Sequence, residues 1–470
     1  MGVITMAKQR RLEEEVDLIS LLPDGVLGDI VSFLPTKDGI RTQLLSSRWR
    51  HIWRSSAPLN VHLHDIWQST RLADVSRALS AHPGPGRRFS VHIDDEGYAD
   101  AALDAWLRSP ALDNLQELEI HFSSRLLYWG TQSLWLPASV FRFSPTLRVA
   151  SFKACVIPDA IIIGNNNPNY WSVLKQLTLS SVRISEGSLH ALLAGGGCPV
   201  LESLLLLDNN VCPRYRIASP SLRSIGVRSR WGYECGADGE DHPGLLQLVI
   251  EDAPCLERLL LFRGVEIDVS VISAPRLAIL GELQGHCRMI QFGNDRSLQG
   301  SSTTVGILMT VVPGIRVLAL SYVKPCVVIN LIKCFPNLET LHVEITTIGE
   351  EYASYDECWK LTGTLDIRLR KIVVLKYYHD MKSYSDFAKF FVLNANVLES
   401  MTLELKFGKV GNNEWIRRQR ELLQIENRSS RGAWFDFVSS VGSSSLLPEE
   451  QVHDLSIHDP FERTIHQYFC

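Results

Sequence analysis

The feature that most constrains the fold of this sequence is an apolar pattern that recurs between residues 115 and 403. In each copy a leucine or isoleucine is followed three, and usually also five, positions later by another apolar residue. Seven of the eleven copies also carry a proline two positions before the first apolar residue. The copies begin at Leu115, Leu147, Leu174, Leu201, Leu222, Leu256, Leu277, Ile315, Leu338, Leu369 and Leu398. The shared proline position disfavours the alternative interpretation, a set of unrelated strands in an α/β domain.

The spacing inside each copy has a direct physical meaning. Residues two positions apart share one face of a strand, so the second and third apolar side chains point the same way. One such strand cannot bury its apolar face alone, and neighbouring copies must stack into a solenoid. Successive copies begin 21 to 38 residues apart. The shorter spacings are typical of leucine-rich repeats, and the longer ones require insertions or a degenerate repeat.

Residues 17–56 predict three short helices. Pro23 suits the first turn of a helix, and Pro35 ends that helix. A second helix begins near Thr36 and runs through Leu45, and a third begins near Ser46 or Ser47, since these hydroxyls can cap a helix N-terminus. Their apolar side chains recur every three or four residues, at Leu27, Ile30, Val31, Leu34, Ile40, Leu44, Leu45, Trp49, Ile52 and Trp53. A unit of about 40 residues cannot bury so much apolar surface by itself, which favours a partner.

Composition limits the partners and the location. The formal net charge is −5 and the pI is near 6.3, which gives no reason to expect nucleic acid or an anionic membrane as partner. No apolar window reaches the roughly 18 residues of a membrane-spanning helix, and residues 1–15 do not resemble a secretory leader. Ten scattered cysteines without a Cys-x-x-Cys pair favour a reduced protein of the nucleus, the cytoplasm or both.

The sequence offers no motif for catalysis. It has no Gly-x-Ser-x-Gly elbow, Walker phosphate loop or His-Glu-x-x-His zinc motif, and its cysteines are not clustered as zinc ligands. Residues 195–197, all glycine, could approach a phosphate, but a turn that ends a helix is favoured. Residues 92–96 could hold a metal, but a polar strand end is favoured. We therefore expect a non-catalytic protein with no cofactor and no metal.

Residues 17–53 closely resemble the F-box of a large family of plant F-box, leucine-rich-repeat and FBD proteins. The matching positions are Leu22, Pro23, Leu27, Ile30, Leu34, Pro35, Arg41, Leu45, Ser46 and Trp49. Further along the chain, residues 334–341 resemble the last repeat of that family. Residues 369–372 and 390–399 resemble the FBD core, and residues 418–423 resemble the tail that follows it.

The resemblance implies an α/β protein in which a small three-helix F-box precedes a leucine-rich-repeat solenoid with a C-terminal FBD segment. The implied parts are a flexible N-terminal tail (1–16), the F-box (17–56), degenerate leucine-rich repeats (57–345), an FBD region that continues the solenoid (346–410), and a C-terminal helix and capping segment (411–470). A helix is expected over 414–425, and a closing strand over 453–457.

The resemblance also implies a role as substrate-recognition subunit of an SCF-type (Skp–cullin–F-box) E3 ubiquitin ligase. The F-box would bind a Skp-type adaptor and, through it, a cullin scaffold. The repeats would hold an unidentified target protein on their concave strand face and loops. The implied adaptor-binding residues are Leu22, Pro23, Leu27, Ile30, Leu34, Pro35, Leu45 and Trp49.

Two departures from the family pattern concern the F-box. Gly25 stands where an acidic residue commonly follows Asp24, and Ser47 replaces one of two basic residues before Trp49. Both changes predict weaker adaptor binding, since glycine in a helical turn costs up to about 1 kcal/mol relative to alanine. Two alternatives therefore stay open: a repeat scaffold without ligase assembly, and a receptor that binds a small ligand in the solenoid.

Overall fold

The computed structural model divides the chain into two compact units, residues 1–123 with 137–147 and residues 124–136 with 148–470. The residues that it describes are 18–19, 21–32, 34, 36–55, 59–63, 75–77, 79–80, 86–93, 99–122, 134–162, 171–194, 196–209, 212–229, 245, 247–262, 267–284, 289–293, 311–346, 366–406, 410–439 and 447–462. The expected flexible tail, residues 1–16, lies outside them.

The first unit begins with the three predicted helices. They are α2 (Asp24–Ser32), α3 (Thr36–Thr42) and α4 (Ser47–Ser55). The predicted starts are confirmed: α2 begins directly after Pro23, and the Ser46 hydroxyl accepts a hydrogen bond from the Trp49 N–H at 3.4 Å. The predicted end of the second helix at Leu45 is wrong, because α3 ends at Thr42 and a turn follows. Parallel strands follow, with their connecting helices: β1 (Leu59–Leu63), β2 (Gly86–Ile93), α6 (Ala99–Leu107), η1 (Pro110–Leu112), β3 (Glu117–Phe122) and η2 (Ala138–Phe143).

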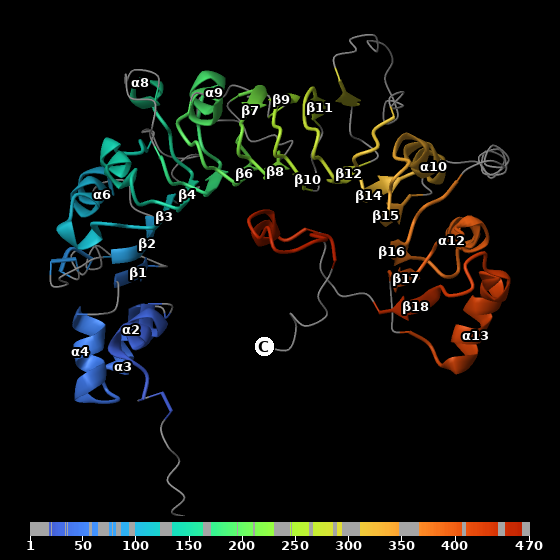
Figure 1. The fold of residues 1–470 in the computed structure, drawn as a ribbon, viewed down its shortest axis with the longest axis horizontal. Coiled ribbons are helices and arrows are strands. Elements are labelled where there is room, and N and C mark those ends of the chain that lie inside the picture. Colours follow the sequence, from blue (N-terminus) through green and yellow to red (C-terminus); the bar gives the residue numbers. More distant parts are fainter. Residues whose placement is uncertain are drawn as a thin grey trace, which may run out of the picture. The chain divides into compact units, whose positions relative to one another are not determined.

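The second unit contains a long parallel sheet, which we call the inner sheet (Figure 1). Its strands, in spatial order, are β4 (Val149–Lys153), β5 (Gln176–Ser180), β6 (Ser203–Leu207), β8 (Ser224–Arg228), β10 (Arg258–Leu261), β12 (Ile279–Gln284), β14 (Val317–Val323), β15 (Thr340–Ile345), β16 (Lys371–Tyr377), β17 (Ser400–Leu405) and β18 (Trp434–Val438). Each predicted repeat from Leu147 to Leu398 supplies one strand. The predicted solenoid is therefore confirmed.

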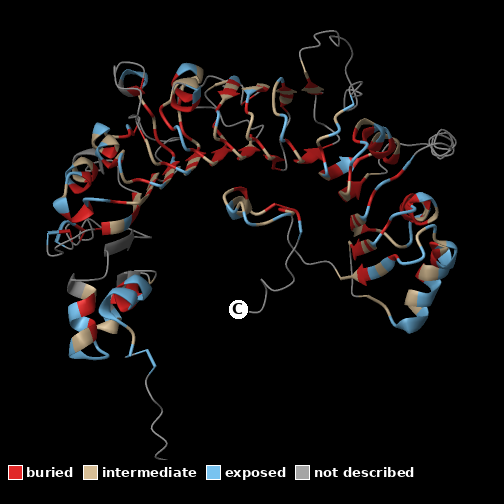
Figure 2. Ribbon diagram, in the orientation of Figure 1, coloured by how far each residue is buried: buried red, intermediate tan, exposed pale blue. Residues whose placement is uncertain are grey.

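The register shows why the repeat works. Leu177, Leu204 and Ile225 are neighbours across β5, β6 and β8, and none of the three side chains is exposed. Residues from the FBD-like part continue the same pattern, because β16 and β17 pair in parallel with β15 and with each other. Figure 2 shows the resulting buried row along the inner sheet in red.

The turns after β4, β5 and β6 are equivalent. Ala154, Ser181 and Asp208 each have a left-handed backbone, with φ between 51° and 58°. The N–H of each donates to a backbone carbonyl of the next strand at 2.7 to 2.9 Å. The buried Asn209 side chain accepts from the Val182 N–H at 2.7 Å and donates to a carbonyl of β5 at 3.0 Å. Such side-chain bonds satisfy backbone groups that a tight turn would otherwise leave unpaired.

The outer layer of the second unit contains helices and a second sheet. The second sheet was not predicted from the sequence. The helices are α8 (Asp159–Ile162), α9 (Glu186–Ala194), α10 (Pro325–Cys334), α12 (Lys382–Asn394), α13 (Asn413–Leu422) and η4 (Ile425–Asn427). The sheet consists of β7 (Arg214–Ala218), β9 (Gln247–Asp252), β11 (Asp268–Val271) and β13 (Met289–Phe292), all parallel. Strand β9 lies in the long interval between Leu222 and Leu256, so it explains part of that spacing.

The chain finally crosses the concave side of the inner sheet (Figure 1, red). We call residues 447–462 the return segment. It contains one short helix, η5 (Glu449–Val452), followed by turns. The closing strand expected over 453–457 is therefore wrong: these residues form no strand. The backbone N–H groups of His453 and Asp454 instead donate to the Glu450 carbonyl at 3.1 and 3.2 Å.

Candidate protein-binding surfaces

The F-box helices expose several large apolar side chains. Leu44 is 85% exposed and Leu45 66% exposed, in the turn between α3 and α4. Ile30 on α2 is 41% exposed. Pale-blue segments on these helices mark this exposure in Figure 2. Exposed apolar groups that gather on one small unit are typical of an interaction surface.

The structure describes seven of the eight predicted adaptor-binding residues, and it places them in three different environments. Leu27 and Trp49, which are 0% and 9% exposed, form the internal core of the F-box with Val31 and Ile52. Leu22 packs against this core and is half-buried. Leu34 is also half-buried, whereas Pro23, Ile30 and Leu45 are exposed; Pro35 lies outside the described residues. A fully enclosed side chain such as Leu27 has no surface to offer a partner, so its role is to support the surface.

Arg48 joins the third helix to the start of the first. Its Nε donates to the Asp24 carboxylate at 2.8 Å, and its Nη2 donates to the Leu22 carbonyl at 2.5 Å. A Cβ added at Gly25 would meet nothing within 4 Å. The glycine is therefore not required by a close contact, and its effect on the F-box is confined to helix propensity.

The inner sheet turns every second side chain toward its concave face. Ser203, Ser224 and Arg258 lie side by side there, across β6, β8 and β10. The next row along the strands includes Leu205 and Leu260. Together with residues from neighbouring strands they make an apolar patch, the concave floor, whose members are at most 8% exposed: Leu205, Leu207, Leu260, Phe262, Ile279, Ala319 and Leu375.

Three apolar side chains of the return segment pack on the concave floor. Leu447, Val452 and Phe461 are at most 2% exposed and belong to the same apolar cluster as the floor. Val452 fills the space above Gly226, where an added Cβ would come within 2.7 Å of the valine Cγ2 and 2.8 Å of Leu205 Cδ1. The absence of a side chain at Gly226 thus creates the hollow that accepts Val452.

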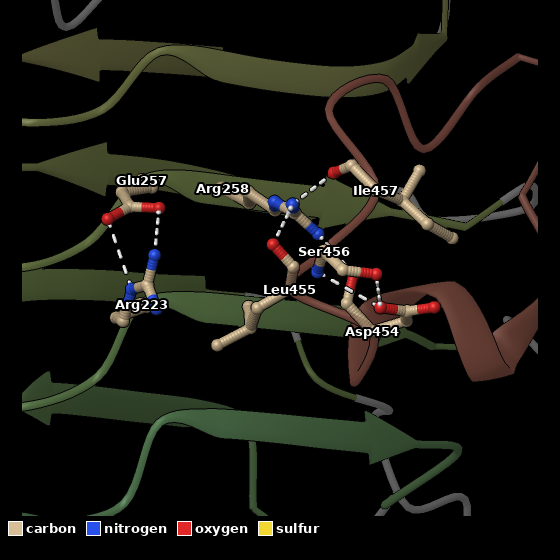
Figure 3. Close-up of polar contacts among 7 residues, drawn as sticks. All are labelled: Arg223, Glu257, Arg258, Asp454, Leu455, Ser456 and Ile457. Atoms are coloured by element: carbon tan, nitrogen blue, oxygen red, sulfur yellow. Dashed lines mark hydrogen bonds and ion pairs between the residues drawn. The ribbon is translucent and has the colours of Figure 1, made fainter.

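The side chain of Arg258 binds backbone carbonyls of the return segment (Figure 3). Its Nη1 donates to the Asp454 carbonyl at 2.8 Å, and its Nη2 donates to the carbonyls of Leu455, at 3.1 Å, and Ile457. Arg258 is 4% exposed, and burial lowers its pKa. Neighbouring Arg223 pairs instead with Glu257, at 3.0 and 3.1 Å. Because Glu257 is paired with Arg223, the adjacent Arg258 is directed at the return segment.

His453 is enclosed by hydroxyl groups of the sheet. Its Nδ1 lies 2.7 Å from the Ser203 hydroxyl, and its Nε2 lies 2.7 Å from the Thr178 hydroxyl. Gln176 Nε2 donates to the His453 carbonyl at 3.4 Å, and the Ser203 hydroxyl also donates to the Val452 carbonyl at 3.0 Å. Burial lowers the pKa of His453 to about 4. The docked imidazole is therefore neutral at physiological pH, with one nitrogen as donor and the other as acceptor.

Ion pairs hold both ends of the return segment. At one end Arg228 pairs with Glu449 as well as with Asp208. At the other end the buried His342 Nε2 lies 2.8 Å from an Asp459 carboxylate oxygen, and Lys371 lies 2.6 Å from Glu462.

The environment of Asp459 favours its charged form. Burial alone would raise the pKa of Asp459, but the hydrogen bond and charge of His342 together with the Phe461 N–H outweigh it, and the pKa is lowered. The His342 ring also lies 5.8 Å from the Phe461 ring, centroid to centroid. One histidine of β15 therefore contacts both the acidic and the aromatic part of the return segment.

Comparison with known proteins supports the two-part organisation. A family model for the F-box domain matches residues 19–60. A second model, described as "FBD-associated F-box protein At5g56370, LRR repeats", matches residues 103–343, which is 241 of 470 residues. The chain belongs to this FBD-associated F-box family with leucine-rich repeats. The resemblance of residues 17–53 and the repeat pattern are confirmed.

Individual relatives of this F-box family come from Arabidopsis thaliana. The F-box/LRR-repeat protein At3g03360 is 29% identical over 284 residues, which cover 58% of this chain and 54% of that protein. The F-box/FBD/LRR-repeat protein At2g04230 is 27% identical over 275 residues, which cover 55% of this chain and 58% of that protein. The chain thus spans about half the length of the curated relatives that it matches.

Among the described residues of this F-box protein, no group of three or more His, Cys, Asp or Glu side chains is placed to hold a metal ion. None of the described helices has the length and apolarity to span a membrane. Burial raises the pKa of both Cys155 and Cys198 to about 12, so neither thiol is activated as a nucleophile. Gly196, two residues after the end of α9 at Ala194, has φ +84°, as expected for a turn that ends a helix. Residues 94–96 lie outside the described part.

The residues that hold the return segment were not predicted from the sequence. Arg258, His342 and Lys371 occupy strand positions that the repeat pattern leaves unspecified. A signal was nevertheless present, because the positions between the repeated leucines must face the concave side. In β6 Leu205 lies between two repeated leucines and Leu207 is two positions further along the same face, and apolar residues there indicate that something covers the face.

Proposed function

We propose that this chain is the substrate-recognition subunit of an SCF-type E3 ubiquitin ligase. The F-box binds a Skp-type adaptor and, through it, a cullin scaffold, while the solenoid holds a target protein. The chain itself performs no chemistry: it raises the effective concentration of target lysines near the ubiquitin-charged enzyme. Assembly of this kind would take place in the nucleus or the cytoplasm.

The exposure of apolar side chains on the F-box carries the proposal. Leu44 and Leu45 lie in one turn with most of their surface open, although the core beneath them is filled by Leu27 and Trp49. A small helical unit that already has a core gains nothing by exposing two adjacent leucines, unless a partner covers them. An apolar groove on an adaptor is the kind of partner that such helical anchors fit.

The test is co-expression with a Skp-type adaptor, followed by size exclusion and a binding titration. The informative variant is Leu44→Ser/Leu45→Ser, because both side chains are exposed and their replacement leaves the core intact. If these residues are anchors, we expect at least a tenfold loss of affinity, since each buried anchor contributes more than about 1 kcal/mol.

A matched control is Val397→Ser/Leu422→Ser, which removes two apolar side chains that are 49% and 47% exposed in the second unit. We expect this variant to bind the adaptor as the parent does. If the folded parent forms no complex, or if both double variants bind equally, the ligase proposal is wrong. A repeat scaffold or a small-ligand receptor would then be the better interpretation.

A further inference from the structure

The concave floor needs a cover. Leu205, Leu260 and Leu375 are at most 2% exposed although they point away from the core between the layers. The face of a sheet that meets solvent normally carries polar residues at these positions. Contiguous apolar surface of this kind marks a binding site. In the structure the cover is the return segment of the same chain.

The contacts of the return segment are those of a bound peptide. Ser203 and Arg258 donate hydrogen bonds to its carbonyls, which any peptide of suitable path can supply. Side-chain pockets add selectivity at two anchors, Val452 over Gly226 and Phe461 beside His342. Backbone recognition combined with pockets for a few side chains is the usual division of labour in peptide binding.

Charge adds a second element of selectivity. The return segment contains five carboxylates and no lysine or arginine: Glu449, Glu450, Asp454, Asp459 and Glu462. On the concave face Arg228 pairs with Glu449 and Lys371 pairs with Glu462, while the charge of Arg258 helps to lower the pKa of Asp454. Complementary charges steer association and exclude wrong partners more than they add affinity.

We propose that the concave face from β5 to β16 binds an acidic segment of the target protein, and that the return segment occupies this surface as an internal competitor. The segment recognised carries an aliphatic β-branched anchor and an aromatic anchor about nine residues later, as Val452 and Phe461 do. The inference deepens the proposed function, on which it rests for the identity of the partner as a ligase target.

The same contacts allow a target segment to replace the return segment on the concave floor. A target segment of this chemistry would bury the same floor and bind the same carbonyl donors, so displacement leaves no apolar surface exposed. The tether gives the return segment an effective concentration on the order of millimolar. Targets therefore bind only when their local concentration or affinity overcomes that of the return segment.

The test uses the full-length chain and a fluorescent peptide of residues 447–462, without adaptor or ligase. Binding is measured by anisotropy to the parent and to the variant Val452→Ser/Phe461→Ser, in which the internal competitor has lost its anchors. We expect the variant to bind the peptide at least ten times more tightly than the parent. Addition of Arg258→Ala to the variant should weaken binding at least tenfold.

Two control peptides define the chemistry recognised. A peptide with serine at both anchor positions should not bind the variant. A peptide with Glu449→Lys and Glu462→Lys should bind at least tenfold more weakly than the unchanged peptide, because it places cations opposite Arg228 and Lys371. If a folded variant does not bind the peptide, or binds the lysine-substituted peptide equally well, the proposal is overturned.

A second experiment decides the matter if the anchor variant fails to fold. A protease site placed in residues 440–446 allows the parent to fold intact and then to be cut. We expect the labelled peptide to replace the released segment within hours. A segment that stays bound after cutting, without exchange over a day, would be a fixed part of the solenoid, and the proposal would be wrong. Neither experiment contains adaptor, so failure here leaves the ligase proposal to its own test.

Discussion

The contact between Gly226 and Val452 yields a prediction that can be worked out quantitatively. Replacement of Gly226 by alanine would place a Cβ 2.7 Å from Val452 Cγ2 and 2.8 Å from Leu205 Cδ1. Overpacking of this degree costs about 1–3 kcal/mol. Since the return segment has no strand pairing at this point, we expect the strain to be relieved by its detachment rather than by distortion of the sheet.

Hydrogen exchange of residues 447–462, followed by mass spectrometry, measures the free energy of this local opening. Because about 1.4 kcal/mol corresponds to a factor of ten, Gly226→Ala should lower the protection of the return segment by about fivefold to 150-fold. Val452→Ala should lower it by a similar factor through loss of buried surface. The double variant should be no worse than Val452→Ala alone, because the new methyl group fills the space that the valine leaves.

The control is Gly432→Ala, since an added Cβ there meets nothing within 4 Å; it should leave protection of the return segment unchanged. Independent contributions add, whereas contacting residues show a coupling energy of about 0.5–3 kcal/mol. If the effects of Gly226→Ala and Val452→Ala are additive, or if Gly226→Ala changes protection less than threefold, the described docking of Val452 is refuted.

Three further predictions concern protonation and the F-box. Burial lowers the pKa of His453 from 6.5 to about 4, so this residue favours docking fully above pH 6.5, and its contribution of up to about 3 kcal/mol is lost as pH falls toward 4. In hydrogen exchange, His453→Asn should remove the loss between pH 6.5 and about 5, whereas the loss that comes from Asp459, whose pKa is also lowered, should remain near pH 4. Leu27→Ala should destabilise the F-box by about 2–5 kcal/mol, whereas the exposed Leu45→Ala should cost less than about 0.5 kcal/mol, measured as exchange protection of the F-box helices. Gly25→Ala should stabilise α2 by up to about 1 kcal/mol and raise adaptor affinity, because its Cβ meets no neighbour; reduced protection of α2 would contradict this.

The solenoid could be predicted because its determinants are local. Each L-x-x-L-x-L copy specifies one strand, and the register that joins Leu177 to Leu204 repeats the same spacing. The F-box helices were equally accessible, since Pro23 and Ser46 mark their starts. Assignment of individual F-box residues to core or surface was less successful: buried Leu27 shares a helical spacing with exposed Ile30 on α2, and spacing alone does not show which side the core occupies.

The second sheet escaped prediction for a different reason. Its strands carry short alternating apolar residues, such as Tyr215 with Ile217 and Val269 with Val271, within stretches where a repeat normally places a helix. Alternation over four or five residues is a weak signal. Parallel pairing of β7, β9 and β11 becomes visible only when the inner strands have set the stacking distance between successive repeats.

The return segment shows what local patterns leave open. Its sequence has no helical or strand periodicity, and its bonds connect residues such as Ser203 and Val452 that lie 249 positions apart. The sheet nevertheless indicates that its concave face is covered. Strand β6 is buried at every position from Ser203 to Leu207, which is typical of a strand that is covered on both faces. Sequence could thus indicate that the concave face is occupied, but not by what. The ion pairs of Arg228 with Glu449 and of Lys371 with Glu462, together with the bonds from Arg258 to backbone carbonyls, hold the return segment there, and under our proposal a competing target segment presents the same groups.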